Sequence, residues 1–452
     1  MNKTIVSRRL SAASLIIIFS LLISLLPSCS GSKTDTAELL ATVPADASAV
    51  AALNLKSVIE KTGCKIEGSK IVPGKEVAAL VAGQDRDTAD RIRAILNGET
   101  GVDPSSAIFF VEGSDFYITG FLADPDTFRK YISEDGAMQI ASENGIDRCG
   151  NTALKGNQFW IRASHRNDID PAEIARFSEL SEKTSFLSNA YSSRLAEISH
   201  DIEGWGNLAA IYNASGMSFR DKTMAGLGLA VLFSDARDLA FNADFENGRF
   251  ISSLSILNSK GEPAKFNFPS DRIDPAMVKE LSGSADTFFA MALTPALVKS
   301  LEKELGDKNI PGAEMILSAL GAIDGTCAVA ANGSMVKGAV STTGENTADL
   351  TDFISSSTGS TVIKDGKILR FNNGEVNGTL EAADIAPQLK GAMFALVTSG
   401  TAPTGQFTPA DLPVKYTLIA LSPSQGSMEI TSEIRAFNEK ENILLTFLKA
   451  IK

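Results

Sequence analysis

The chain resembles itself in two places, and this internal similarity constrains its fold more than any other feature. Residues 44–63 (PADASAVAALNLKSVIEKTG) resemble residues 284–306 (SADTFFAMALTPALVKSLEKELG). Each segment has the pattern of an apolar strand, a polar turn and a helix that ends at glycine. Asn54 and Thr294 suit helix N-caps, and Pro295 suits a first helical position. The similarity indicates two units of related architecture within one chain.

Further segments extend this similarity along both units. Residues 104–132 match residues 324–354, and each predicts strand, turn, strand, polar turn and short helix. The hairpin pattern of residues 245–262 matches that of residues 422–441, while residues 201–216 form a weaker third copy of the opening module. Such modules predict an α+β fold of two similar halves, each a largely antiparallel sheet with helices packed on one face.

The similarity also predicts the organisation of the chain into successive parts. The first half carries a predicted helical insertion, which Asp170 would cap before Pro171. The predicted parts are a signal peptide (1–28), a lipidated tether (29–38), a first α+β repeat (39–265), its helical insertion (171–199) and a second α+β repeat (280–452).

The N-terminus has the pattern of an export signal. Lys3, Arg8 and Arg9 precede an apolar stretch that is shorter than the roughly 20 residues a membrane-spanning helix needs. The sequence LPSC at 26–29 then resembles the lipobox of bacterial lipoproteins, in which the chain is cut before a cysteine that becomes lipidated. We therefore expect a lipid anchor on Cys29; the alternative is an ordinary cleaved signal followed by an incidental cysteine.

Composition narrows the classes of partner. A hydrophobic content of 44% with 21% charged residues is typical of a globular protein. The formal net charge is −12, and it becomes −15 once the three N-terminal cations are removed, which argues against nucleic-acid binding. Cys64, Cys149 and Cys327 leave two possibilities open, a Cys64–Cys149 disulfide or three buried free thiols, of which we favour the second.

These features together resemble a family of Bacteroidales lipoproteins that is classed as a domain of unknown function. The resemblance rests on the lipobox, the VPADA opening at 43–47, the NLKS turn at 54–57 and the duplicated layout. It implies a protein of the outer membrane, anchored by its lipid, and it carries over no functional residues.

Two details follow from the same resemblance. Asp-Thr-Ala occurs at 35–37 and 87–89 and looks like the O-glycosylation motif of that phylum, which would modify Thr36 and Thr88. In that phylum, acidic residues soon after the lipidated cysteine favour surface display. The first charge after Cys29 is that of Lys33, so we favour the periplasmic face of the outer membrane over the cell surface.

The sequence lacks recognisable catalytic motifs. It has two histidines, His165 and His200, and it contains no HExxH, GxSxG or CxxC pattern, so we predict neither a metal site nor a cofactor. Several carboxylates lie close together in sequence, and we interpret them as helix caps or polar faces. These are Asp124 with Asp126, Asp168 with Asp170, and Glu302 with Glu304.

Trp205 is the candidate ligand-binding residue. It lies in GWGNLA (204–209), which fits GxGxxA formally, although the internal similarity places it in a strand rather than in a nucleotide-binding turn. The flanking glycines would leave room around the indole, which could then stack on a sugar or form a binding hot spot. Packing in the core is the alternative interpretation.

The sequence therefore favours a non-enzymatic envelope lipoprotein that binds a glycan or a protein partner, or that serves as a structural spacer. The alternative is a carboxylate-dependent hydrolase that acts on envelope glycans in the cleft between the repeats. Asp46, Asp201 and Asp286 recur at the starts of corresponding strands, and we interpret this recurrence as shared turn geometry.

Overall fold

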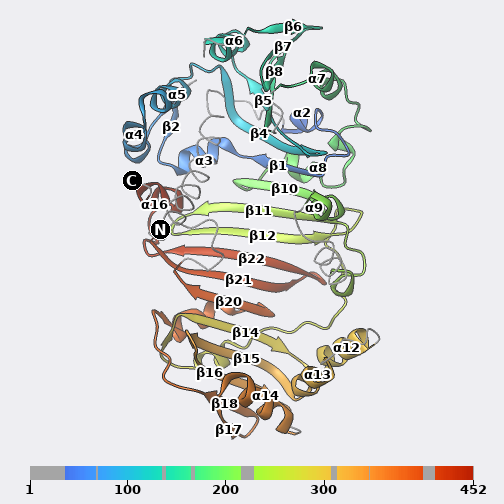
Figure 1. Cartoon of the computed structure of the whole chain (residues 1–452), viewed down its shortest axis with the longest axis vertical. Helices are drawn as coiled ribbons and strands as arrows, with labels where there is room; N and C mark the ends of the chain where they lie inside the picture. The colour runs from blue at the N-terminus through green and yellow to red at the C-terminus, as the bar shows by residue number, and fades with distance from the viewer. Residues whose placement is uncertain are drawn as a thin grey trace, which may run out of the picture.

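One long antiparallel sheet runs the length of the molecule (Figure 1). The structure, a computed structural model, describes residues 36–67, 70–134, 139–163, 168–214, 229–306, 313–345, 347–400 and 413–450. Within these ranges 18 strands belong to the sheet. The prediction of an antiparallel α+β fold is thus confirmed.

The strands follow one another across the sheet in an order that differs from their order in the chain. From one edge to the other they are β6 (Ala141–Glu143), β7 (Ile146–Cys149), β8 (Thr152–Lys155), β9 (Gln158–Ala163), β5 (Asp115–Leu122), β4 (Val102–Glu112), β1 (Ala49–Leu53), β10 (Ile202–Asn207), β11 (Asp238–Glu246), β12 (Arg249–Leu257), β22 (Ser427–Ala436), β21 (Val414–Ser424), β20 (Phe394–Ser399), β14 (Thr287–Leu293), β15 (Ile323–Asn332), β16 (Met335–Thr342), β18 (Ile368–Asn372) and β17 (Thr361–Asp365).

Corresponding strands of the two halves occupy matching positions on either side of the β12–β22 pair. One direction gives β11, β10, β1, β4, β5, β9 and β8, and the other gives β21, β20, β14, β15, β16, β18 and β17. Ser253 pairs with Thr431 across β12 and β22. Each is the fifth residue after the glycine of its own hairpin turn, Gly248 or Gly426, so the order has an approximate twofold arrangement about this pair.

The β12–β22 pair joins what the sequence suggested would be two separate sheets. The register runs from Arg249 opposite Arg435 to Ser255 opposite Glu429 without a break. Two short ladders lie outside the main sheet: β2 (Lys65–Glu67) with β3 (Lys70–Val72), and β13 (Ser284–Ala285) with β19 (Leu380–Glu381).

The two faces of the sheet are named here after one residue each. Residues directly opposite in an antiparallel pair point to the same side, so the register assigns every strand residue to a face. The Trp205 face carries Trp205, Ser253 and Thr431, whereas the Phe241 face carries Phe241 and Ile430.

Helices cover both faces at each end of the sheet, which corrects the expectation of one covered face. At the end formed by the first half, buried side chains of α2 (Thr36–Leu40), α7 (Pro171–Ser178), η1 (Phe186–Ser188) and α8 (Ser192–Ala196) pack on the Trp205 face. On the Phe241 face of the same end lie α3 (Leu55–Lys61), α4 (Lys75–Ala82), α5 (Arg86–Leu96), α6 (Pro125–Glu134) and α16 (Ile443–Ala450). A sheet buried on both faces needs apolar residues on both, as in β5, where six successive residues are buried.

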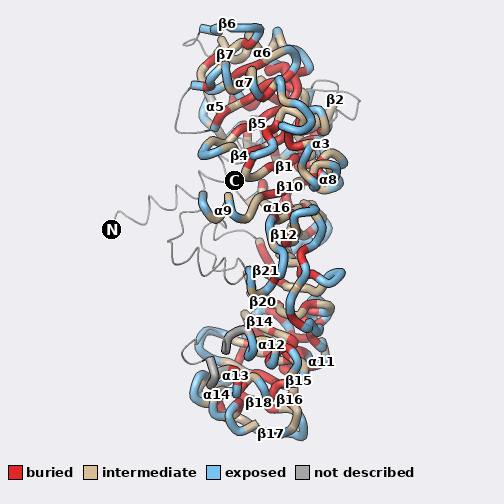
Figure 2. Tube along the Cα trace, turned by 90° about the vertical axis from the view of Figure 1, so that its right-hand side faces the viewer, coloured by how far each residue is buried: buried red, intermediate tan, exposed pale blue. Residues whose placement is uncertain are grey.

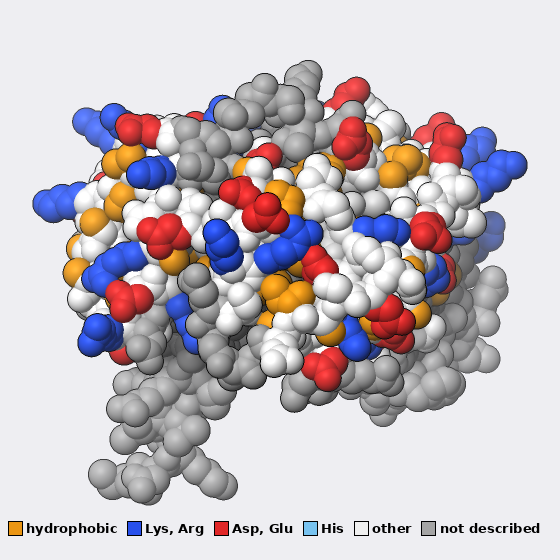
Figure 3. Space-filling model, turned by 90° about the horizontal axis from the view of Figure 1, so that it is seen from above, with side chains coloured by type: hydrophobic (Ala, Val, Ile, Leu, Met, Phe, Trp, Pro, Cys, Tyr) orange, Lys and Arg blue, Asp and Glu red, His pale blue; other side chains and the backbone are white. Residues whose placement is uncertain are grey.

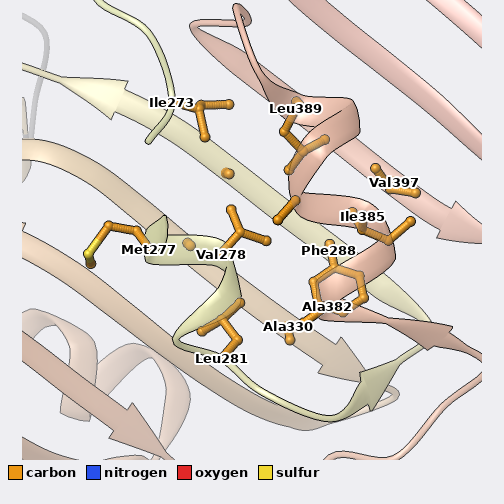
Figure 4. Packing of buried hydrophobic residues seen from close by; sticks show 14 of the residues in the cluster. Ile273, Met277, Val278, Leu281, Phe288, Ala330, Ala382, Ile385, Leu389 and Val397 are labelled. Carbon is orange, nitrogen blue, oxygen red and sulfur yellow. The ribbon is translucent and has the colours of Figure 1, made fainter. Parts of the chain in front are cut away.

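The other end is also a three-layer arrangement. The helices α11 (Pro275–Lys279), α15 (Ala382–Ile385) and η2 (Ala386–Leu389) pack on the Trp205 face, and Figure 4 shows their side chains meeting Phe288 and Val397 of the sheet. On the Phe241 face lie α12 (Pro295–Gly306), α13 (Ala313–Gly321) and α14 (Ala348–Thr358). One more helix, α9 (Leu208–Ala214), follows β10 directly.

Among the described residues, the middle of the sheet carries less cover than the ends. Residues 249–255 of β12 are all of intermediate exposure, whichever face they point to. The turned view of Figure 2 has bulky ends and a thinner middle near β12, β21 and β20. On the Trp205 face this middle region is mostly polar: Ser253, Ser255, Glu429, Thr431 and Glu433 point there, together with the apolar Ile251. We call β12 and β22 the waist.

Local signals in the sequence placed the helix starts well. Asn54 accepts a hydrogen bond from the Ser57 amide at 3.1 Å, and Thr294 accepts one from the Leu297 amide at 3.2 Å. Asp170 caps α7 as expected, by accepting from the Ala172 amide at 2.9 Å.

The structure tests the expected state of the cysteines. Cys64, Cys149 and Cys327 are free thiols, so the Cys64–Cys149 disulfide does not form; Cys64 and Cys149 are buried and Cys327 is half-buried. Burial raises the pKa of the Cys327 thiol to about 12.

Among the described helices, none combines the length and the apolar character that crossing a bilayer requires.

Candidate functional site

Trp205 lies in β10, so the prediction that GWGNLA belongs to a strand is confirmed for residues 204–207. Its side chain is 5% exposed and packs edge-on against Phe186, with 5.3 Å between the ring centroids. The core interpretation therefore accounts for most of the indole surface. The remaining part borders a pocket, described below.

The glycines beside Trp205 do not make room for its ring, which corrects our expectation. Neighbouring residues of a strand point to opposite faces, so Gly204 and Gly206 lie on the Phe241 face. A Cβ at Gly204 would overlap the Phe241 ring, and a Cβ at Gly206 would approach Cδ1 of Ile211. The glycines admit these two side chains instead.

A pocket of about 390 Å³ opens at the end of β10 and β11 on the Trp205 face. We call it the Trp205 pocket. Its walls come from the turn before β1, the segment between η1 and α8, and the strand ends. The lining is mostly polar: Asp46, Ser48, Ser188, Asn189, Trp205, Asn207, Arg237, Asp238 and Ser259, with Ala45, Ala47, Ala190, Ala210 and Gly261.

Asp238 is the buried acid of this pocket, with 7% of the residue exposed. Burial raises its pKa, while hydrogen bonds from Asn207 and Trp205 act in the opposite direction. The Asn207 amide donates to Asp238 Oδ1 at 2.9 Å. The neighbouring Arg237 is exposed, so the pocket combines an indole, an amide, a carboxyl and a guanidinium.

A second cluster lies at the opposite end of the same strands. Asp201 is 1% exposed and accepts hydrogen bonds from Lys61 Nζ at 2.6 Å, Ser57 Oγ at 2.6 Å and the Phe245 amide at 2.7 Å. These contacts tie α3 to β10 and β11. The sequence analysis missed this cluster because Asp201 lies 140 residues from Lys61 along the chain. The available signal was the four-residue spacing of Ser57 and Lys61, which places helical side chains together.

The three recurrent aspartates lie in different surroundings. Asp46 is exposed at the Trp205 pocket, whereas Asp201 is buried. Asp286 accepts from the Thr379 amide at 3.1 Å and from Ser399 Oγ at 3.3 Å. Their recurrence therefore does not mark one shared site.

The histidines give no catalytic arrangement. His165 lies outside the described residues. His200 Nδ1 lies 2.6 Å from Asp244 Oδ2, and Asp244 also accepts from the Asp201 amide. Because α8 ends at Ala196 and β10 begins at Ile202, His200 lies in the segment between them. Across the described ranges no three His, Cys, Asp or Glu side chains gather as metal ligands would.

The predicted modification sites have unequal surroundings. Cys29 lies outside the described residues. Thr36 is the first residue of α2 and is 5% exposed, so glycosylation there would have to precede folding. Thr88 is half-buried in α5, and its hydroxyl donates to Asp85 at 2.8 Å. Modification at all three positions stays a prediction.

Three of the carboxylates that are close in sequence, Asp124, Asp126 and Asp170, contact residues of their own helices. Asp124 caps α6, and hydrogen bonds from Thr127 lower its pKa. Asp126 pairs with Arg129 at 2.7 Å on the helix surface. Figure 3, seen along the long axis, shows positive and negative side chains interspersed over this end of the molecule.

Comparisons with known proteins add little. No protein-family model matches the chain, and no curated protein matches it. Among solved structures it is similar to TP0453: in crystal form IV the identity is 11%, the match covers 48% of this chain and 79% of that chain, and the TM-score is 0.29. In crystal form III the identity is 11%, the coverage 77% and 96%, and the TM-score 0.28. Likeness at this level carries no argument about function.

Proposed function

We propose that this protein is a lipoprotein of the outer membrane, anchored through Cys29, that binds an envelope glycan in the Trp205 pocket. The observation that carries the binding role is the lining of this pocket. Indole, carboxyl, amide, guanidinium and hydroxyl groups converge there within about 390 Å³.

These groups suit a sugar for a chemical reason. A sugar presents hydroxyls that both donate and accept, and planar polar side chains can meet them from several directions. Asn189, Asn207 and Arg237 supply donors, whereas Asp46 and Asp238 supply acceptors. The edge of Trp205 adds an apolar contact.

The anchor and the two-half duplication belong to the same proposal. The signal peptide and the lipobox support the anchor. The equal strand order outward from β12 and β22 supports the duplication. Thr36 follows Cys29 by seven positions, so the tether reaches at most about 25 Å and keeps the folded body close to the membrane. Lys33 favours the periplasmic side, and protease treatment of intact cells should therefore leave the protein uncut.

A binding measurement tests the glycan role. The full-length lipidated protein in detergent is titrated with peptide-free peptidoglycan disaccharide in a calorimeter. We expect binding that is lost in Arg237→Gln and retained in the matched control Arg272→Gln, an exposed arginine away from the pocket. Binding that both variants retain equally would place the ligand elsewhere, and absence of binding by the parent protein would overturn the proposal.

One observation favours the hydrolase as a second candidate. The Trp205 pocket holds two carboxyls in unlike surroundings, the buried Asp238, whose pKa is raised, and the exposed Asp46. Such a pair is the usual basis of acid–base catalysis. At the junction of the halves, by contrast, Glu433 already accepts from Tyr416 and Arg435. New reducing ends released from peptidoglycan, and lost in Asp238→Asn, would establish the enzyme.

A further inference from the structure

A second pocket, of about 350 Å³, lies on the Trp205 face in the other half. We call it the Tyr416 pocket. It opens beside β21 and β22 and beneath the segment that holds β19, α15 and η2. Its lining comprises Thr379, Leu380, Glu381, Ala383, Asp384, Ile385, Pro387, Gln388, Lys415, Tyr416, Arg435 and Glu439.

The two pockets occupy equivalent positions in the strand order. Asp238 and Tyr416 each stand ten residues before the glycine of their hairpin turns, Gly248 and Gly426. The residue before each is a cation, Arg237 in one pocket and Lys415 in the other. The approximate twofold arrangement about Ser253 and Thr431 therefore relates one pocket to the other.

The Tyr416 pocket repeats the chemical classes of the Trp205 pocket with different residues. Tyr416 supplies the aromatic ring, and the Arg435 guanidinium lies over it at 5.9 Å. The Tyr416 hydroxyl donates to Glu433 at 3.1 Å, which fixes the ring. Lys415 and Glu439 supply a cation and an anion at the rim.

The surface between the pockets is polar. A line across the sheet from Asp238 to Tyr416 passes over Ser255 and Ser253 of β12 and then Thr431 of β22. Eight residues along the strands and three strand spacings across them separate its ends, which gives about 30 Å. The strands of this region are paired on both sides, so a peptide could not add to them as a further strand.

We propose that the two pockets and the polar waist form one extended site for a linear glycan chain, with separate sugars of the chain held in the Trp205 and Tyr416 pockets. This inference rests on the proposed function of the Trp205 pocket. It adds the Tyr416 pocket, a second contact point about 30 Å away, and a preference for long chains. Two linked contacts raise affinity over either alone, since the second forms within the same complex.

The experiment compares short and long probes on the full-length lipidated protein in detergent. The probes are peptide-free peptidoglycan strands, from the disaccharide to fractions long enough to span about 30 Å. We expect the long strands to bind about 100-fold more tightly than the disaccharide. Lys415→Gln should reduce the affinity for long strands to near that for the disaccharide and leave disaccharide binding at the Trp205 pocket unchanged. Lys279→Gln, an exposed lysine on α11, is the matched control and should change neither.

The outcomes separate this inference from the proposed function. If the disaccharide binds and requires Arg237, but length brings no gain and Lys415→Gln has no effect, the extended site is wrong and the Trp205 pocket stands. If neither probe binds, both proposals fall. Circular dichroism and thermal melting of each variant exclude loss of folding as the cause.

Discussion

The two ends of the sheet share a strand order and differ in how their cores are filled. On the Trp205 face of the first end, Ile108, Phe110 and Trp205 are buried under α7, η1 and α8. The equivalent positions at the other end hold Ala328, Ala330 and Val397. There the covering segments and Phe288 of β14 supply much of the bulk (Figure 4).

The same strand order is therefore compatible with different residues in the core. A layer between sheet and helices has to be filled to native density, but either layer can supply the volume. At these three positions the first end has larger strand residues, whereas at the second end Met277, Ile385 and Leu389 of the covering helices meet smaller ones beside Phe288.

Truncation of a buried aromatic side chain on a strand of the first end should have the largest effect on stability. Phe110 is buried and stacks with Tyr117 at 5.0 Å between ring centroids. Phe110→Ala should lower the free energy of unfolding by about 3–5 kcal/mol. Urea denaturation followed by tryptophan fluorescence is a suitable measurement, because Trp160 and Trp205 both lie at this end.

Ala330 occupies the position equivalent to that of Phe110, so its enlargement provides the reciprocal variant. Ala330→Leu should also destabilise, by about 1–3 kcal/mol, because the fully buried site has no spare volume. An increase in stability in Ala330→Leu would mean that the second end is underpacked, contrary to this account.

A buried arginine makes the second contrast between the ends. Arg162 is buried and pairs with Asp115 and with Glu173, the latter at 3.3 Å. Arg162→Leu should destabilise by about 2–3 kcal/mol, less than a fully buried pair would cost, because both carboxylates are partly exposed. The equivalent residue at the other end is the exposed Asn372, where Asn372→Leu should change stability by about 0.5 kcal/mol or less. Equal losses of stability in Arg162→Leu and Asn372→Leu would contradict this difference between the two ends.

The close approach at Gly204 is a smaller difference. The equivalent position in the second half is Leu396, so only the first half needs a glycine there. Gly204→Ala should cost about 1–2 kcal/mol because its methyl group overlaps the Phe241 ring. In a double-mutant cycle, Phe241→Leu should recover part of this loss. Strict additivity of the two substitutions would show that the ring is not the obstacle.

The pH dependence at Asp238 is the smallest expected effect. Burial raises the pKa of this carboxyl, so the folded state holds its proton more tightly than the unfolded state. Its contribution to stability is therefore greatest at acidic pH and falls as the pH rises through the folded-state pKa. The destabilisation caused by Asp238→Asn should accordingly be larger at acidic pH than at pH 7, as urea titrations at several pH values can measure. A difference that grows with pH would contradict this assignment.

Sequence reasoning reached the local modules and their ends. Period-two apolar patterns, hairpin glycines and the caps Asn54, Asp170 and Thr294 depend on neighbours within a few residues, so they can be read directly. The candidate site was reached in part. A ligand-binding role for Trp205 stays a prediction, and the role given to Gly204 and Gly206 was wrong, because they make room for Phe241 and Ile211 on the other face.

The sequence by itself thus determined the strand–turn–helix units, whereas the export signal that it predicts stays a prediction. Only the tertiary structure decided that β12 and β22 pair into one sheet, that helices cover both faces of each end, and that Asp238 and Tyr416 stand at equivalent pockets. These features join residues far apart in the chain. Their formation depends on which edges and volumes fit together in space, and periodicity along the chain carries no information about that fit.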